Sequence, residues 1–263
     1  MEIVLQPPRK RLGDRLFGWT LWGGIIVLLI VSFGPAEVWR FPMLFSKSEN
    51  MRQFGEAFLQ PDFRAWKLYV AQMWLTLQIA LWGTTLALVI AVPAGLAGAR
   101  NIAPAWDRRP VRMLMDVLRA VPDLVLGTLF LVSVGLSPFA GVMALALHTG
   151  GVLGKLFSEA VEAIDKGPVE GVRATGAAPL QEIVWGVVPQ VAPLWTSYGL
   201  YRFEANARAA TVLGLIGAGG IGQVLFDAIN SFNYGQVAAI ALVIVVAVSA
   251  IDLLSQVIRR RLV

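Results

Sequence analysis

The chain has no cysteine and a single histidine among its 263 residues. Disulfides, thiolate metal ligands and cysteine nucleophiles are therefore excluded, and so is a metal site built from several histidines of one chain. The sequence also lacks the G-x-x-x-x-G-K-[ST] loop that cradles nucleotide phosphates, so we expect no ATP site and no cofactor on this chain. Without a cluster of catalytic carboxylates or nucleophiles, a membrane enzyme is disfavoured.

Charge is scarce as well: charged residues make up 15% of the chain, against 57% hydrophobic residues. A soluble domain needs more charge than this to cover its surface. Four uncharged runs reach or exceed the ~20 residues that cross a hydrocarbon core, and they lie at 16–36, 68–99, 124–154 and 228–251. We therefore expect an all-α polytopic membrane protein. The net charge of +5 indicates no nucleic-acid partner, because the basic residues cluster at the ends of the apolar runs.

Six transmembrane helices can be placed along the chain, at 16–35, 72–98, 112–136, 138–157, 187–204 and 236–257. The run 124–154 is too long for one helix, so we divide it at Ser137-Pro138 and let the third helix begin earlier. That start draws Arg119 and Asp123 toward the membrane. Because these two residues are four apart, we expect them to pair on one helix face.

The distribution of lysine and arginine sets the expected orientation. With a cytoplasmic N-terminus, the inner segments hold 14 basic residues and the outer segments hold seven. This bias supports cytoplasmic N- and C-termini in a lipid bilayer. The expected organisation is a cytoplasmic tail at 1–15, a first span with an outer-surface segment at 16–71, a transmembrane domain at 72–258 and a cytoplasmic tail at 259–263.

Part of the segment before the second span has helical periodicity. Met51, Phe54 and Phe58 follow one another at i, i+3 and i+7, which places them on one helix face. We expect a helix lying along the outer membrane surface here, with an ordinary loop as the alternative.

The uncharged stretch 209–226 is rich in glycine. Counting it as a seventh span would put the cluster Arg259–Arg261 outside, against the positive-inside rule. Since glycine permits bends, we expect a broken or re-entrant segment at the outer side, buried in protein. Two interpretations of its glycines stay open, close helix packing and a flexible outer gate. The gate candidates are Gly217, Gly219, Gly220 and Gly222.

A polar island from Ser158 to Glu182 interrupts the apolar sequence and is expected to be helical. It is either a docking surface for a partner in water or a solvated loop between two spans. In a docking surface, the carboxylates of Glu159, Glu162 and Glu170 could pair with basic groups of the partner.

The island also carries a spaced motif. Glu170, Gly176 and Pro189 have the separation found in the cytoplasmic signature of bacterial ABC importer permeases, which is E-A-A, three residues, G, nine residues, I-x-L-P. The chain departs from this signature at four positions. Gly171 and Val172 replace the two alanines, Gly186 replaces isoleucine and Val188 replaces leucine.

Other segments resemble the phosphonate permease family more specifically. They are Thr76–Ala80 (TLQIA), Arg119–Asp123 (RAVPD), Pro138–Gly141 (PFAG), Ala146–Thr149 (ALHT), Tyr201–Arg208 (YRFEANAR), Thr211–Gly214 (TVLG) and Gly217–Gly222 (GAGGIG). The resemblance covers roughly residues 60–258. It implies the type I ABC importer permease fold with six transmembrane helices, in a homodimer in the bacterial cytoplasmic (inner) membrane.

The same resemblance implies the partners and the function. The partners are two cytoplasmic ATP-binding subunits, which hold ATP and Mg²⁺, and an external substrate-binding protein. The function is import of phosphonate or a related phosphorus oxyanion by alternating access, driven by ATP hydrolysis on the partners. Residues 158–189 then form a coupling hairpin. Its ATPase-coupling candidates are Glu170, Gly171, Arg173, Ala174, Gly176 and Pro189.

Charged and polar residues in or near the bilayer are candidates for the transport pathway. They are Arg202, Glu204, Arg208, Arg119, Asp123 and His148. We expect Arg208 to pair with Glu204 at the outer end of the fifth span, which leaves Arg202 to face an anion. The alternative is that all three are structural ion pairs or dimer contacts. A lone histidine such as His148 is more often a packed, hydrogen-bonded core residue than a ligand.

Two other functions stay open. An ion-driven secondary transporter needs no docking hairpin and commonly shows internal repeats, which we do not find in the sequence. A permease for another small solute, such as methionine, phosphate or phosphite, is harder to separate because no residue identifies the cargo.

Overall fold

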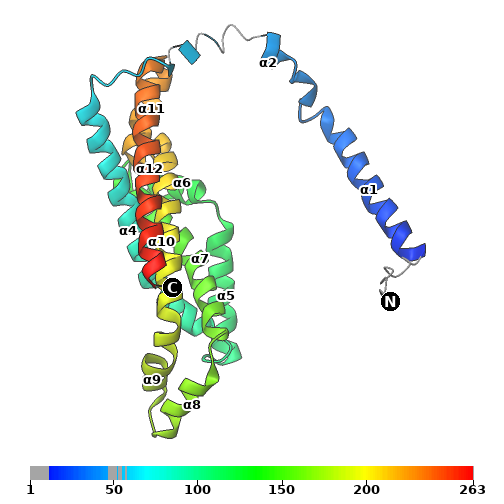
Figure 1. Ribbon diagram of the computed structural model, residues 1–263, viewed down its shortest axis with the longest axis vertical. Helices are drawn as coiled ribbons and strands as arrows, with labels where there is room; N and C mark the ends of the chain where they lie inside the picture. The colour runs from blue at the N-terminus through cyan, green and yellow to red at the C-terminus, as the bar shows by residue number, and fades with distance from the viewer. Residues whose placement is uncertain (1–11, 47–51, 53–54, 57, 263) are drawn as a thin grey trace, which may run out of the picture. The chain divides into compact units, whose positions relative to one another are not determined.

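The structure is a computed structural model that describes residues 12–46, 52, 55–56 and 58–262 (Figure 1). It divides into two units, Met1–Glu56 and Ala57–Val263. The first unit holds helix α1 (Leu12–Phe33), the 3-10 turn η1 (Val38–Arg40) and the short helix α2 (Met43–Ser46). Large apolar side chains of α1 are exposed, as expected for a helix that faces lipid. Met51 and Phe54 lie outside the described residues, so the surface helix predicted there stays a prediction.

The second unit is an all-helical bundle, and no strand occurs in the described part of the chain. Its helices are α4 (Trp66–Gly98), α5 (Ala105–Ala120), α6 (Asp123–Val134), α7 (Pro138–Glu162), α8 (Lys166–Ala174), α9 (Pro179–Glu182), α10 (Val188–Leu213), α11 (Ile221–Asn230) and α12 (Tyr234–Leu262). Two π-helical turns, η2 (Ile183–Val187) and η3 (Gly214–Ala218), flank α10.

Several of the predicted membrane segments are present, and two of them are broken. Helices α4, α7 and α12 are long and apolar enough to cross a membrane unaided. Two further segments pass the same test only as bent pairs, α5 with α6 and residues 179–218 with α11. The described residues thus hold up to five candidate spans, and α1 adds a shorter apolar part, Phe17–Phe33, where the sixth span is predicted.

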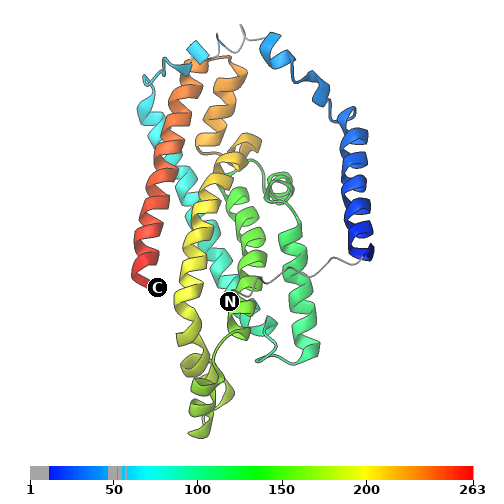
Figure 2. The ribbon, with the colours of Figure 1, turned by 45° about the vertical axis from the view of Figure 1, so that its right-hand side comes forward.

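The third span is not the single helix predicted at 112–136. Helix α5 ends at Ala120, and the axis of α6 makes an angle of 89° with the axis of α5. In Figure 2 the view runs almost along the axis of α6. Pro122 explains the break, because a proline has no N–H and forces the residue before it out of the helical conformation. Val121 is accordingly extended, at φ −79° and ψ 122°.

The glycine-rich stretch is a broken segment, as predicted. Helices α10 and α11 meet at 59° across η3, where Gly217, Gly219 and Gly220 have φ of 105°, 80° and 76°. The bend is fastened to α4, since the backbone N–H of Ile221 donates to the buried Thr76 hydroxyl over 2.9 Å. A Cβ on Gly220 would collide with that hydroxyl, so the absence of a side chain is required there.

A buried polar contact joins the three central helices of the bundle. The Asn206 amide of α10 donates to the Thr84 hydroxyl of α4 and accepts from the Thr149 hydroxyl of α7, each over 2.9 Å. Closer to the hairpin, the ring of Phe157 on α7 stacks on Trp195 of α10 at 4.6 Å. These two contacts fix the register of α7 against α10, with α5 on the other side of α7 (Figure 2).

Candidate functional site

The polar island forms a helical hairpin that extends beyond the other helices at one end of the bundle (Figures 1 and 2). Helix α8 begins after Asp165, whose carboxylate caps it by accepting from the Gly167 N–H over 3.0 Å. After α8 the chain reverses at Gly176, which has φ of +83° and whose N–H donates to the Arg173 carbonyl. Glycine adopts this left-handed conformation without the strain that a side chain adds. Gly176 therefore forms a tight turn between α8 and α9.

A bidentate ion pair closes the hairpin. The Arg173 guanidinium of α8 donates to both carboxylate oxygens of Glu182 in α9, over 2.8–3.1 Å. Hydrogen bonding from Arg173 holds the pKa of the Glu182 carboxyl below its ordinary value, and the same bond raises the pKa of Arg173. Arg173 is thus occupied within the hairpin, so its predicted part in coupling is to hold α8 on α9.

Two contacts attach the hairpin to α10. The Gln190 side chain accepts from the Asp165 N–H over 3.1 Å and donates to the Asp165 and Gly186 carbonyls. Gly186 also packs against α8, because a Cβ there would lie 3.0 Å from the Val169 Cα. The glycine that departs from the family signature therefore lets α8 approach η2.

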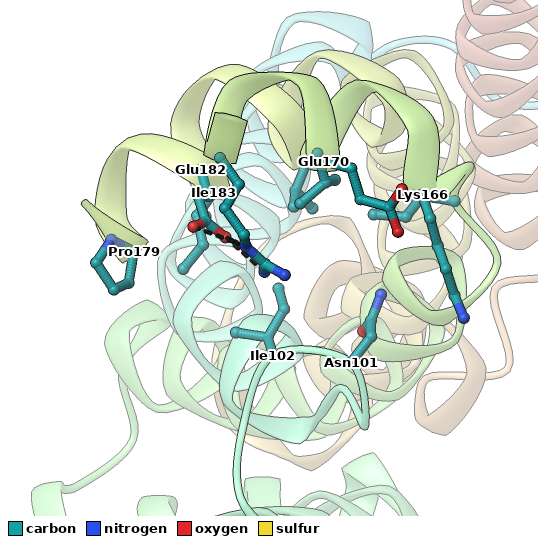
Figure 3. A pocket seen from close by; sticks show the side chains of 11 residues that line it. Asn101, Ile102, Lys166, Glu170, Pro179, Glu182 and Ile183 are labelled. Atoms are coloured by element: carbon teal, nitrogen blue, oxygen red, sulfur yellow. Dashed lines mark hydrogen bonds and ion pairs between the residues drawn. The ribbon is translucent and has the colours of Figure 1, made fainter. Parts of the chain in front are cut away.

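A cleft of about 570 Å³ separates the hairpin from the α4–α5 loop (Figure 3). Asn101 and Ile102 come from that loop, Lys166 and Glu170 from α8, and Pro179 from α9. The hairpin is therefore attached through its base rather than packed along its whole length, and its own ion pair holds its two helices together.

The opposite side of the hairpin exposes apolar groups. Leu180 is 71% exposed and Trp185 is 70% exposed. A shallow groove beside Trp185 is lined by Gly171, Gly176 and their neighbours on α8. Exposed apolar groups beside a hollow are typical of a docking surface rather than of a solvated loop. Sequence reasoning missed Leu180 and Trp185, although both are apolar residues in or beside a polar segment.

One carboxylate assigned to docking is used inside the chain instead. Glu162 binds the Arg112 guanidinium and accepts from the Arg100 N–H, the latter over 2.7 Å. The prediction that Glu162 is free for a partner is therefore wrong. Glu170 is exposed, lines the cleft and stays a candidate.

The predicted Arg119–Asp123 pair does not form. Arg119 donates instead to Asp116, one turn back on α5, over 3.0 Å, and Lys155 of α7 lies 3.6 Å from the same carboxylate. Asp123 follows the Pro122 break and starts α6, so it does not share a helix face with Arg119. His148 is half-buried, with its Nδ1 3.0 Å from the Val121 carbonyl at that break. This favours the hydrogen-bonded structural role for His148.

The Glu204–Arg208 pair is confirmed at 2.9 Å, but its predicted place at the outer end of the fifth span is wrong. Glu204 also lies 3.8 Å from Arg259, in the last turn of α12. Glu204 and Arg208 are therefore level with the C-terminal cluster Arg259–Arg261. The physical reason is that α10 begins in the protruding hairpin and needs several turns to reach the level at which α12 ends (Figure 1).

Within the described residues no group of three or more His, Asp and Glu side chains could hold a metal ion. The four gate glycines lie together around the bend between α10 and α11, with Gly222 tightly against the Thr211 carbonyl. Close packing is thus visible at Gly222, and the gating role stays a prediction.

A bundle of membrane-length helices with an exposed hairpin at one end is the architecture of a membrane transport subunit. Residues 83–263 match the family of binding-protein-dependent transport system inner membrane components, and the chain belongs to that family. Its members are multi-pass inner-membrane permeases, not enzymes.

Individual relatives narrow the comparison. The chain is 41% identical over 211 residues to the phosphite transport system permease protein PtxC of Stutzerimonas stutzeri, covering 78% of this chain and 75% of the relative. It is 36% identical over 278 residues to the phosphate-import permease protein PhnE of Mycolicibacterium smegmatis, covering 100% of this chain and 50% of the relative.

The fold has counterparts among solved structures. An inward-facing conformation of the MetNI methionine ABC transporter superposes with a TM-score of 0.67 at 20% identity, covering 77% of this chain and 99% of that chain. At this identity the likeness concerns the fold alone, which is that of a type I ABC importer permease.

Proposed function

We propose that this chain is the permease subunit of a binding-protein-dependent ABC importer that carries phosphite, phosphonate or a related phosphorus oxyanion across the bacterial inner membrane. The observation that carries the proposal is the α8–α9 hairpin. It is exposed, it is closed by the Arg173–Glu182 pair, and it presents Leu180 and Trp185 to a partner. The cargo follows from the 41% identical phosphite permease, whereas the methionine transporter supports only the fold.

The proposed assembly is a homodimer of this chain with two cytoplasmic ATP-binding subunits and an external substrate-binding protein. The hairpin is the part proposed to seat on the ATP-binding subunit, with Glu170, Gly171, Ala174 and Gly176 around the contact and Arg173 and Pro189 supporting it. The missing P-loop supports a separate subunit as the site of ATP and Mg²⁺.

The proposed mechanism is alternating access. Closure of the ATP-binding subunits moves the hairpins, and the short attachment at Gly186 and Gln190 transmits that movement into α10. Because α10 continues through η3 into α11, a shift of its base reaches the glycine bend beside Thr76. In the proposed orientation, the hairpin and both termini lie on the cytoplasmic side of the membrane. The α10–α11 bend then lies on the outer side and is the outer gate.

The test is reconstitution of the complete complex in proteoliposomes, with the binding protein loaded in turn with phosphite, phosphate, methylphosphonate or, as a control, methionine. We expect ATP hydrolysis and uptake to rise with at least one of the three phosphorus compounds and not with methionine. Failure of an ATP-binding subunit to copurify, or stimulation by methionine alone, would refute the proposal.

The turn at Gly176 gives a matched pair of variants for the same assay. Gly176→Ala strains a left-handed position by about 1 kcal/mol, whereas asparagine tolerates this conformation better. We expect Gly176→Ala to lower uptake per ATP hydrolysed more than Gly176→Asn, with both proteins inserted normally. Equal coupling in the two variants would show that the turn conformation is not what coupling needs.

A further inference from the structure

Arg202 differs from the basic side chains nearest to it in the bundle. Arg119 and Lys155 share Asp116, Arg112 binds Glu162, and Arg208 and Arg259 share Glu204. Arg202 has no carboxylate oxygen within ion-pair distance among the residues that the structure describes, and its enclosed Nε has no hydrogen-bond partner there.

An arrangement of this kind is costly. Leaving a buried donor of a charged group unpaired costs at least ~1–3 kcal/mol, and an ionised side chain within a membrane segment is a functional candidate by default. A structural role would be served by a carboxylate partner, as it is at Arg208. The unpaired Arg202 is therefore best explained by an anionic partner that arrives from outside the chain.

The contacts between α7 and α10 fix the level of Arg202 in the bundle. Asn206 bonds Thr149 and Trp195 stacks on Phe157, so Arg202 lies level with the stretch of α7 between those two partners. That stretch includes Lys155, which reaches toward Asp116 on α5. Arg119 lies on the same carboxylate, so two cations share the single charge of Asp116.

The helix face around Arg202 carries two small side chains and one hydroxyl. Tyr198 precedes Arg202 by four residues, Ala205 and Ala209 follow it by three and seven, and all four are half-buried. A planar guanidinium binds two oxygens of a phosphorus oxyanion through parallel N–H bonds, which a lysine ammonium does not do.

We propose that Arg202 is a binding residue of the permease itself, which holds the phosphorus oxyanion on the cytoplasmic part of the translocation pathway. The site rests on the proposed function, since it takes its ligand class from the importer and its side of the membrane from the cytoplasmic hairpin. The excess of positive charge from Arg119 and Lys155 attracts the anion to this level, and Arg202 supplies the bidentate contact.

The test is uptake of phosphite by the reconstituted complex at saturating loaded binding protein. Arg202→Gln should lower uptake by about tenfold or more, while the loaded binding protein still stimulates ATP hydrolysis. Phosphite uptake by Arg202→Lys should lie between the uptake by Arg202→Gln and that by the wild type, because lysine keeps the charge and loses the planar fork of the guanidinium. Arg64→Gln is the control, since the Arg64 side chain is 95% exposed and lies before the start of α4.

The absence of cysteine permits a second test that does not depend on how the glutamine variant folds. Arg202→Cys is reacted either with an aminoethyl methanethiosulfonate, which restores a positive charge, or with a neutral methyl methanethiosulfonate. We expect the charged adduct alone to restore phosphite uptake, measured against the complex with the wild-type permease treated with the same reagents.

The possible failures are distinct. A wild-type complex that takes up none of the three phosphorus compounds would refute the proposed function. A wild-type complex that takes up phosphite, with Arg202→Gln equal to it, would refute the Arg202 site alone. Equal recovery with both thiol reagents, or recovery with neither, would also overturn it.

Discussion

At the scale of single residues, the Arg173–Glu182 pair is the most direct test of the hairpin's rigidity. Either Arg173→Gln or Glu182→Gln should lower uptake per ATP hydrolysed by roughly two- to fivefold, the range typical of an exposed ion pair. The double variant Arg173→Glu with Glu182→Arg should recover most of the loss, because it rebuilds the bridge with reversed charge. A double variant no better than either single one would show that the residues act separately.

The same pair makes a prediction about pH. The pKa of the Glu182 carboxyl is lowered by Arg173, so the pair's stabilisation is present above the unfolded-state pKa and is lost as pH falls through the folded-state value. The raised pKa of Arg173 keeps the guanidinium charged throughout. Hydrogen exchange of α8 amides, corrected for its intrinsic rate, should therefore be unchanged between about pH 7 and about pH 5. Loss of protection of the α8 amides near pH 6 would show that a group other than Glu182 governs the pH dependence.

Gly186 and Gly171 form a second matched pair at this scale. In Gly186→Ala the new Cβ lies 3.0 Å from the Val169 backbone, which cannot swing away, so we expect a destabilisation of about 1–2 kcal/mol. Gly171 is helical with no atom within 4 Å of an added Cβ, and Gly171→Ala should stabilise α8 by roughly 0.5–1 kcal/mol. Thermal unfolding of the purified permease in detergent measures both, and a stable Gly186→Ala protein would contradict the packing described.

At the scale of helices, the Asn206 amide is the contact that fixes α4, α7 and α10 together. Asn206→Leu removes one bond to Thr84 and one to Thr149, and interhelical hydrogen bonds in membranes contribute about 0.6–1.7 kcal/mol. We expect a loss of about 1–2 kcal/mol on that basis. Thr85→Val is the control, since the exposed Thr85 hydroxyl bonds only the Leu81 carbonyl of its own helix. Equal stability of the two variants would show that Asn206 is not a fastening point.

The existence of each helix could be predicted from the sequence, because an apolar run of membrane length has few other solutions in lipid. The pairing of Arg119 could not, since the four-residue spacing to Asp123 matters only within a continuous helix. Pro122 stands between them, and its effect on Val121 was a readable signal that the prediction did not use. The hairpin's turn was predictable for the opposite reason, because the left-handed position at Gly176 depends on one local residue.

Contacts between helices that lie far apart along the chain could not be predicted from the sequence. Asn206 meets Thr84 across 122 positions and Thr149 across 57. No periodicity within α10 distinguishes Asn206 from a pathway residue, because its role depends on the register of three helices. The four-residue spacing already predicted that Arg208 pairs with Glu204 and that Arg202 is left over. The packing of the helices adds that Arg259 shares Glu204 and that the Arg202 Nε has no partner among the described residues.

At the scale of the whole molecule, the Glu204–Arg259 contact changes the number of basic residues counted on each side of the membrane. It puts Arg208 on the same side as the C-terminal cluster. With Arg202 counted inside the membrane segment, as Arg119 is, the predicted bias of 14 basic residues against seven becomes 15 against five. The positive-inside rule then favours cytoplasmic termini more strongly than the sequence alone did.

The cysteine-free chain allows this orientation to be measured with single thiols. Ser231→Cys lies between α11 and α12, whereas Arg208→Cys and Arg261→Cys lie at the other end of α12, and all three positions are exposed. A membrane-impermeant maleimide added to sealed inside-out vesicles should label Arg208→Cys and Arg261→Cys, and added to right-side-out vesicles it should label Ser231→Cys. If Arg208→Cys is instead labelled from the same side as Ser231→Cys, Arg208 lies on the opposite side of the membrane from the C-terminal cluster, against the Glu204–Arg259 contact. Arg202 could then not be a cytoplasmic-side binding residue.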